Sequence, residues 1–160
     1  MTNDYGLVSI ITPTWACAGF IAETIRSIQA QTYTNWELLI QDDCSTDNTR
    51  EVVERFAQGD NRIKYECNDR NSGAAITRNN ALKRAQGRWI AFLDSDDLWL
   101  PEKLQHQLAF MTAHDYAFSY HEYTEMTEDG ADKGVYVSGI KKVGKWMMFA
   151  CCWPGCLTVM

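Results

Sequence analysis

An apolar run, Trp89 to Leu93, ends abruptly in three carboxylates within four residues, Asp94, Asp96 and Asp97. Such a run is typical of a strand buried on both faces of a parallel sheet, and parallel sheets bind ligands just beyond the carboxyl ends of their strands. Carboxylates packed this closely repel one another unless a cation neutralises them, and their hard oxygen atoms suit Mg²⁺ or Mn²⁺. The stretch therefore predicts a metal site; the alternative is a solvated acidic turn.

Strand-like and helix-like segments alternate along the whole chain. Apolar and β-branched residues predict strands over 6–13, 36–41, 62–67 and 88–93, with shorter ones at 117–120, 135–137 and 157–160. Helical spacing predicts helices over 20–31, around 52–56, over 74–86 and over 101–111. We expect Pro13 to end the first strand, because it lacks a backbone N–H, and Gly87 to cap the third helix. The alternation predicts an α/β fold, an open and mostly parallel sheet with flanking helices.

Composition narrows the range of functions. The 160 residues are 46% hydrophobic, which fits a single domain over 1–160, and the net charge of −6 argues against a nucleic-acid binder. No apolar run is long enough to span a bilayer and no export signal is visible, which predicts a cytoplasmic protein. The six cysteines show no disulfide or zinc spacing, and Cys17, Cys44 and Cys67 are isolated and far apart, so we expect reduced, mostly buried thiols. The chain ends on strand-like residues, which predicts a domain truncated at its C-terminus.

Three of the predicted strands deliver polar residues at their carboxyl ends, at 13–15, 42–45 and 94–97. In one parallel sheet these ends converge on a crevice. The acidic cluster would hold a divalent ion there, and such an ion can bridge a diphosphate and stabilise it as a leaving group. The crevice therefore predicts a site for a nucleotide diphosphate and a metal ion.

Other side chains near these strand ends suit a nucleotide. Trp15 offers a ring that can stack on a nucleobase, Asp43 can accept hydrogen bonds from a base or a ribose, and Arg78 is a nearby cation. Plainer alternatives exist for two of them. Trp15 could lie in the core, and Arg78 could pair with Asp69 or Glu66 on the surface.

The usual phosphate-binding motifs are missing. Neither Gly-x-Gly-x-x-Gly nor Gly-x4-Gly-Lys-Ser/Thr follows the first strand, which argues against a Rossmann dinucleotide site and a P-loop. A nucleotidyltransferase is the second enzyme class to consider. It would need a glycine-rich, basic loop at this place, and the segment 14–19 contains no Lys or Arg.

Four blocks of the sequence resemble the signature blocks of glycosyltransferase family 2, in the family's order and spacing. They are 8–15, 42–47, Gly73 with 77–79, and 93–97. The resemblance covers roughly residues 6 to 112. It implies the GT-A (Rossmann-like) fold and a nucleotide-sugar donor.

The resemblance also implies roles for individual residues. Pro13, Thr14 and Trp15 match the segment that lines the base pocket, Asp43 matches the carboxylate that reads the base, and Arg78 matches a basic residue near the nucleotide.

The segment 94–96 matches the DxD motif of the family. This match makes Asp96 the expected metal ligand, while Asp94 is expected to contact the ribose or the metal ion. Asp97 is expected to contact the sugar donor or to support the metal ligands.

The function implied is a metal-dependent, inverting transfer of a sugar from a nucleotide diphosphate sugar, UDP-linked, to a hydroxyl of a glycan or lipid-linked acceptor. Cell-surface polysaccharide synthesis is the family's common use. The catalytic base is expected beyond Met160. A patch over 146–149 with Trp153, flanked by lysines, suggests peripheral contact with the inner face of the membrane, or else core residues. The non-enzymatic alternative is an inert nucleotide-sugar-binding fragment.

Overall fold

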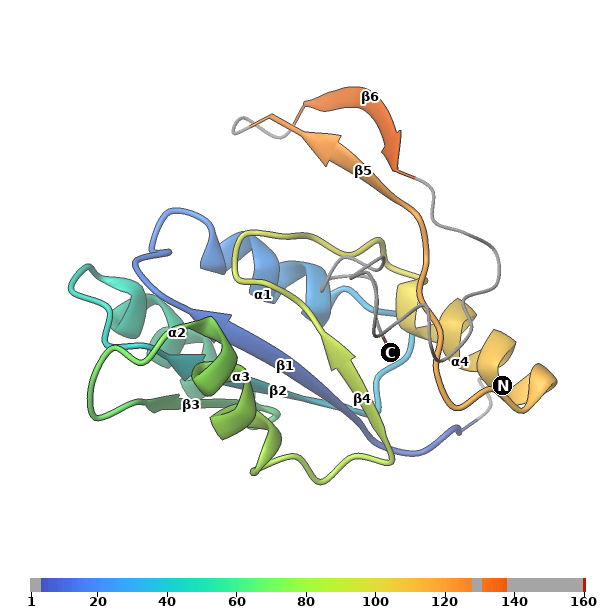
Figure 1. Cartoon of the computed structure of the whole chain (residues 1–160), viewed down its shortest axis with the longest axis horizontal. Coiled ribbons are helices and arrows are strands. Elements are labelled where there is room, and N and C mark those ends of the chain that lie inside the picture. The colour runs from blue at the N-terminus through green and yellow to red at the C-terminus, as the bar shows by residue number, and fades with distance from the viewer. Residues whose placement is uncertain (1–3, 128–130, 138–159) are drawn as a thin grey trace.

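The computed structural model describes residues 4–127, 131–137 and 160, and its centre is a sheet covered on both faces by helices (Figure 1). The strands of this sheet are β1 (Val8–Thr14), β2 (Trp36–Asp42), β3 (Ile63–Cys67) and β4 (Trp89–Phe92). The helices are α1 (Ile21–Gln29), α2 (Thr49–Gly59), α3 (Ala74–Leu82) and α4 (Lys103–His114). The four strands run parallel in the order β3-β2-β1-β4, as the alternation of strands and helices predicts.

Alternate residues of the two central strands serve two cores. Ile10 of β1 and Leu38 of β2 belong to the larger core, which also contains the apolar stripe of α1. Ile11 and Leu39, one residue further on, pack with Ala81 of α3 in a smaller core on the opposite face. Because both faces are covered, every residue of β1 and β2 is buried, and consecutive apolar residues such as Ile10 and Ile11 can serve different cores.

Pro13 does not end the first strand, contrary to the expectation above, and lies inside β1 opposite Gln41. In a parallel strand, successive residues direct their N–H groups to opposite neighbours. Val8 N–H donates toward β2, to Asn35 O, so Pro13 faces the other neighbour, β4. The pairing of β4 with β1 ends at Ile11, so the missing N–H of Pro13 interrupts no bond of the ladder.

The third helix is shorter than expected, and Gly87 has a different role. α3 ends at Leu82, with Lys83 as its C-cap. Gly87 lies against β1 instead: its N–H donates to Ser9 Oγ at 2.8 Å, and a Cβ on Gly87 would lie 2.5 Å from Ser9 N. Only glycine permits this approach of two backbones.

The segment after α4 differs most from the prediction. Residues 117–120 form no strand, although Ser119 and Met160 exchange two backbone hydrogen bonds of 3.0 Å. A separate antiparallel hairpin follows, made of β5 (Tyr123–Met126) and β6 (Asp132–Val137), and β6 contains the strand predicted over 135–137. The strand predicted over 157–160 lies, apart from Met160, outside the described residues. Over the part of the chain that is described, no helix is long and apolar enough to cross a membrane.

Candidate functional site

Hydrogen bonds join the loops that follow β1, β2 and β4 at the carboxyl edge of the sheet. Asp43 N–H donates to Thr14 O at 2.9 Å, which ties the end of β2 to the end of β1. Cys17 links two further segments: its N–H donates to Thr49 Oγ1 at 3.0 Å, and its Sγ accepts from Ser95 Oγ at 3.1 Å. The three groups of polar residues predicted to converge are therefore neighbours.

Trp15 is the exposed aromatic residue of the loop after β1. Its side chain is 58% exposed, so the alternative of a core residue is wrong. Pro13 and Thr14 are buried within β1. The next residue, Ala16, fixes the loop by donating its N–H to Ser45 Oγ at 2.9 Å. Of the three residues predicted to line a base pocket, Trp15 is thus the one whose side chain is open to a ligand.

Asp42 has a structural role in the loop after β2. Its Oδ1 accepts hydrogen bonds from the backbone N–H and the hydroxyl of Ser45, at 2.8 and 2.7 Å. Its Oδ2 accepts from the Tyr65 hydroxyl at 2.6 Å. Asp42 is 1% exposed, so it holds the loop after β2 and presents nothing to a ligand.

Asp43 is held at the site by three hydrogen bonds. Its Oδ1 accepts from Asn68 Nδ2 at 2.8 Å and from Ser72 N–H at 2.7 Å, and its Oδ2 accepts from Gly73 N–H at 2.7 Å. Burial tends to raise the pKa of this carboxyl, but these hydrogen bonds outweigh it and lower the pKa below its ordinary value. Asp43 is therefore ionised at neutral pH. Asp43 is 4% exposed, and the Thr77 hydroxyl also favours its ionised form.

Arg78 lies at the acidic cluster. Its Nη2 forms an ion pair with Asp94 Oδ1, and both side chains are partly exposed. Glu66, one of the alternative partners considered for Arg78, lies against Arg84 Nη1 at 3.4 Å. The structure therefore brings together two of the predicted site residues, Arg78 from α3 and Asp94 from the loop after β4.

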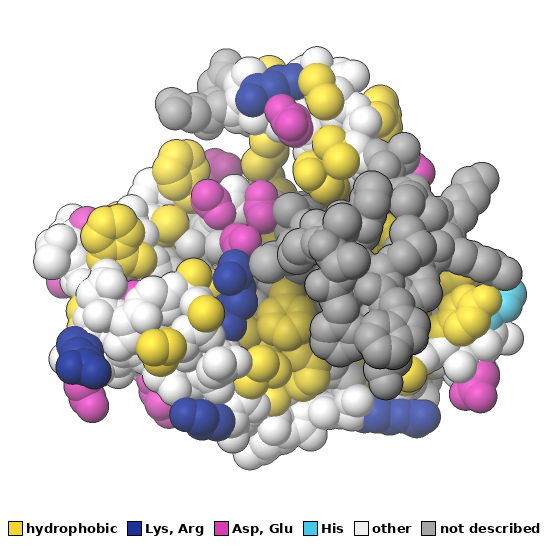
Figure 2. All heavy atoms as spheres, in the orientation of Figure 1, with side chains coloured by type: hydrophobic (Ala, Val, Ile, Leu, Met, Phe, Trp, Pro, Cys, Tyr) yellow, Lys and Arg dark blue, Asp and Glu magenta, His cyan; other side chains and the backbone are white. Residues whose placement is uncertain are grey.

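The acidic cluster Asp94–Asp97 has a net negative charge even when its neighbour Arg78 is counted. Asp96 is exposed and Asp97 is half-buried, and Asp97 N–H donates to Asp94 O at 3.2 Å in a tight turn. Burial, and then the charges of Asp96 and Asp94, raise the pKa of Asp97 to about 6. Figure 2 shows acidic side chains gathered at one place on this face, next to a basic one. A further cation would reduce the repulsion among these carboxylates.

Carboxylate oxygens of this kind suit Mg²⁺ or Mn²⁺. Magnesium is commonly held by one or two carboxylates while substrate phosphates complete its coordination. Within the described ranges, no group of three or more His, Cys, Asp or Glu side chains is placed to hold an ion. The assignment of Asp94 and Asp96 as metal ligands, and of Asp97 as a further contact, stays a prediction.

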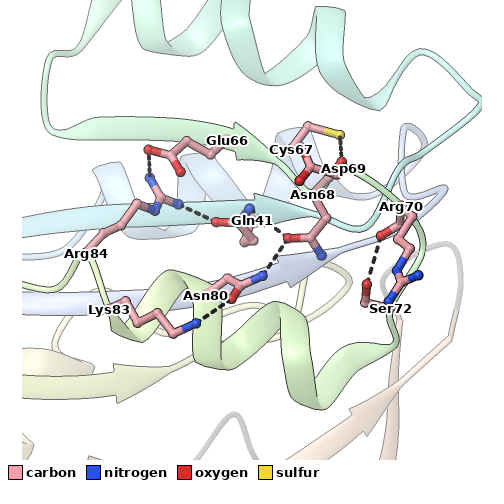
Figure 3. Close-up of a pocket in the computed structure, with 10 residues that line it drawn as sticks. All are labelled: Gln41, Glu66, Cys67, Asn68, Asp69, Arg70, Ser72, Asn80, Lys83 and Arg84. Atoms are coloured by element: carbon pink, nitrogen blue, oxygen red, sulfur yellow. Dashed lines mark hydrogen bonds and ion pairs between the residues drawn. The ribbon is translucent and has the colours of Figure 1, made fainter.

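Asn68, which the sequence does not single out, connects the site to a polar cavity between α3 and β3 (Figure 3). Besides its bond to Asp43, the Asn68 amide accepts from Gln41 Nε2 and Asn80 Nδ2, both at 3.0 Å. The cavity has a volume of about 450 Å³. It is lined by Gln41, Glu66, Cys67, Asn68, Asp69, Arg70, Ser72, Asn80, Lys83 and Arg84. Its position in the sequence, immediately after β3 at the same edge of the sheet, could have identified Asn68 as a site residue.

Comparison with known proteins gives one family and several relatives. The model of the family described as glycosyl transferase family 2 matches residues 9–136. Over 160 residues the chain is 42% identical to the teichuronic acid biosynthesis glycosyltransferase TuaG of Bacillus subtilis, covering 100% of this chain and 64% of TuaG. Over 158 residues it is 44% identical to WfgD of Escherichia coli, named UDP-Glc:alpha-D-GlcNAc-diphosphoundecaprenol beta-1,3-glucosyltransferase, covering 99% of this chain and 60% of WfgD. The chain thus spans less than two thirds of each relative.

Two solved structures share the fold of the central sheet and its helices. TarS 1-349 of S. aureus in complex with UDP has a TM-score of 0.64 and 35% identity, over 68% of this chain and 32% of TarS. The mannosyltransferase PcManGT of Pyrobaculum calidifontis, in complex with GDP-Man and Mn²⁺, has a TM-score of 0.63 and 28% identity. That likeness covers 66% of this chain and 32% of PcManGT.

Proposed function

Because the chain belongs to glycosyltransferase family 2, with the GT-A fold, we propose that it binds the sugar donor of a metal-dependent, inverting glycosyltransferase. The donor is a nucleotide diphosphate sugar, UDP-linked, and the acceptor is a hydroxyl of a glycan or a lipid-linked sugar. The transfer is a step in the synthesis of a cell-surface polysaccharide.

The observation that carries the proposal is the junction of the three loops through Cys17 and Asp43. It places an exposed ring, an ionised carboxylate and an anionic cluster on loops that touch. In the proposed complex Trp15 stacks on the base and Asp43 accepts a base N–H. Asp94 contacts the ribose or the metal ion, and Asp96 binds the ion. The ion would offset the charge of the diphosphate as it leaves.

UDP and the acceptor class are supported by the relatives. TarS is solved with UDP and, separately, with UDP-GlcNAc, and the name of WfgD states a UDP-linked donor and an undecaprenol-linked acceptor. Manganese is supported by the complex of PcManGT. A lipid-linked acceptor favours a cytoplasmic location at the inner face of the membrane. The patch over 146–149 with Trp153, which would contact the membrane, lies outside the described residues.

A nucleotide panel tests the donor proposal. The melting temperature of the chain is measured with UDP, GDP, dTDP and CDP, each with Mn²⁺ and with EDTA. UDP with Mn²⁺ should stabilise the most, since a ligand at one hundred times its Kd adds about 2.7 kcal/mol. Equal shifts for all four nucleotides would contradict the assignment of UDP, and no shift with any of them would contradict the donor site.

A transfer assay separates an enzyme from an inert binding fragment. Release of UDP from UDP-sugars is measured for this chain and for a protein of the length of TuaG that contains it. We assign the general base to no residue of this chain and place it beyond Met160. A base commonly contributes about 10²–10⁴-fold, so the longer protein should be faster by roughly that factor. Equal rates would contradict that placement.

A further inference from the structure

Cys44 and Cys67, expected to be far apart, meet at one carbonyl oxygen. Cys44 Sγ donates a hydrogen bond to Asn68 O at 2.9 Å, and Cys67 Sγ donates to the same oxygen at 3.3 Å. The two thiols also lie within hydrogen-bonding reach of each other. Both residues are partly exposed, and neither forms a disulfide in the structure.

The backbone explains how residues from different strands come together. Asp42, at the end of β2, pairs with Cys67, at the end of β3. After Asp42 the chain turns through Cys44, whose φ of 63° lies in the left-handed region that residues other than glycine rarely adopt. The bond from Ser45 N–H to Asp42 Oδ1, 2.8 Å long, fixes this turn. The turn directs Cys44 back toward the end of β3.

We propose that Cys44 and Cys67 are an oxidisable dithiol that closes into a disulfide. The fold supplies the proximity, since the two sulfur atoms share one acceptor and lie within hydrogen-bonding reach of each other. The disulfide would join the residue that follows Asp43 to the residue that precedes Asn68, and thus cross-link the two loops that meet in the hydrogen bond from Asn68 Nδ2 to Asp43.

The surroundings assign different roles to the two thiols. The guanidinium of Arg50 lies within hydrogen-bonding reach of Cys67. Burial, and then the neighbouring Cys67, raise the pKa of the Cys44 thiol. Because the thiolate is the nucleophile, Cys44 is the less reactive thiol and the resolving one, and Cys67 is the attacking thiol.

The oxidant named is a small-molecule disulfide. The Cys67 thiolate attacks one of its sulfur atoms, forms a mixed disulfide and releases one small thiol. Cys44 then loses its proton to solvent and attacks the Cys67 sulfur, which releases the second small thiol. Two protein thiols are oxidised to one disulfide, and one small-molecule disulfide is reduced to two thiols.

Peptide mapping tests the proposal on the whole chain. The protein is incubated with oxidised glutathione at pH 8, alkylated and digested with trypsin. Cleavage after Arg26, Arg50, Lys64 and Arg70 places the two cysteines in peptides 27–50 and 65–70, neither of which contains another cysteine. The expected product is peptide 27–50 linked to peptide 65–70, which reduction separates. Recovery of both peptides only in alkylated or glutathionylated form would overturn the proposal.

Serine variants test the order of attack. Cys44→Ser keeps a hydroxyl that can donate to Asn68 O, and should leave Cys67 trapped as a mixed disulfide with glutathione. A free Cys67 thiol in that variant would overturn its assignment as the attacking group. The matched control is Cys17→Ser, at the third described cysteine, which should form the linked peptide as the unaltered chain does. Loss of the linked peptide in this control would also contradict the proposal.

Discussion

Glu37, at the amino edge of the parallel sheet, and the cluster Asp94–Asp97, at its carboxyl edge, are carboxylates in opposite surroundings. At the amino edge, Glu37 is 4% exposed and fully engaged: it accepts from Ser9 Oγ at 2.6 Å and Gln86 N–H at 2.8 Å, and it pairs with Lys64 Nζ at 2.7 Å. At the carboxyl edge, the cluster Asp94–Asp97 has the ion pair of Asp94 with Arg78, and burial and like charges raise the pKa of Asp97 to about 6.

This difference distinguishes a carboxylate that stabilises the fold from carboxylates that we assign to ligand binding. A buried carboxylate with all its partners fixes the strands around it, and its loss leaves those partners unsatisfied. Carboxylates that repel one another at the surface weaken the fold, and in the proposed function a cation that arrives with the donor offsets their charge. Substitution of Glu37 should therefore reduce stability, and substitution of a metal ligand in the cluster Asp94–Asp97 should reduce binding.

The largest effect is expected at the amino edge. Glu37→Ala leaves the buried Ser9 hydroxyl and the Gln86 N–H without their acceptor, while Lys64, 43% exposed, is solvated, so the free energy of unfolding should fall by about 3 kcal/mol. Burial tends to raise the pKa of Glu37, but the hydrogen bonds from Lys64, Ser9 and Gln86 outweigh it and lower the pKa below its ordinary 4.5. Its contribution is therefore present above pH 4.5 and lost as the pH falls below that value.

Chemical denaturation at pH 7 and pH 3 measures this change. The matched control is Glu54→Ala, on the exposed face of α2, which should stay within about 0.5 kcal/mol of the unaltered chain. An equal loss at both pH values would refute the part assigned to the Glu37 charge.

Trp15→Ala is expected to weaken the binding of UDP and to leave the stability of the fold nearly unchanged. Removing a stacked aromatic ring costs about 1–3 kcal/mol per base, so the Kd for UDP should rise roughly tenfold or more. The melting temperature should hardly change, because the side chain is 58% exposed. Calorimetric titration with UDP and a thermal melt give both numbers. A lower melting temperature with unchanged affinity would reverse the assignment of Trp15 to the site.

Asp97→Asn should give the smallest effect and the opposite sign to Glu37→Ala. The pKa of Asp97, about 6, lies above its ordinary 3.8, so this carboxyl contributes stability at low pH that is lost as the pH rises through 6. The variant should be more stable than the unaltered chain at pH 8 by about 1 kcal/mol, after allowance for solvent screening, and equal to it at pH 3.

Denaturation in EDTA measures this difference without a bound ion. A variant less stable at pH 8 would show that Asp97 is a structural residue like Glu37.

The sequence predicts the structural features that are set by residues close together in the chain. Apolar residues identify β1, β2 and β4, the alternation of polar and apolar residues identifies β3, and the polar residues after β1, β2 and β4 identify the edge that carries the candidate site. The loop-capping role of Asp42 was also predictable, since its partner Ser45 is three residues away.

What the sequence does not predict depends on contacts between distant segments. Gly87 resembles a helix cap until β1 is seen 2.5 Å from the position of its absent Cβ. Asn68 is one polar loop residue among several, and its importance comes from its bond to Asp43. Cys44 and Cys67 are 23 positions apart in the sequence, and only the turn after β2 brings them to one oxygen.

The central claim, that the carboxyl edge holds a nucleotide diphosphate with a metal ion, is tested most directly by calorimetric titration of UDP into the chain and into Asp96→Ala, each with Mn²⁺ and with EDTA. We expect Mn²⁺ to tighten binding to the unaltered chain at least tenfold, a difference of about 1.4 kcal/mol, and to have no effect on Asp96→Ala. Glu54→Ala, which replaces an exposed carboxylate on α2, should keep the full effect of the ion. Binding of UDP that is the same with and without Mn²⁺, or an Asp96→Ala variant that keeps the effect, would contradict it.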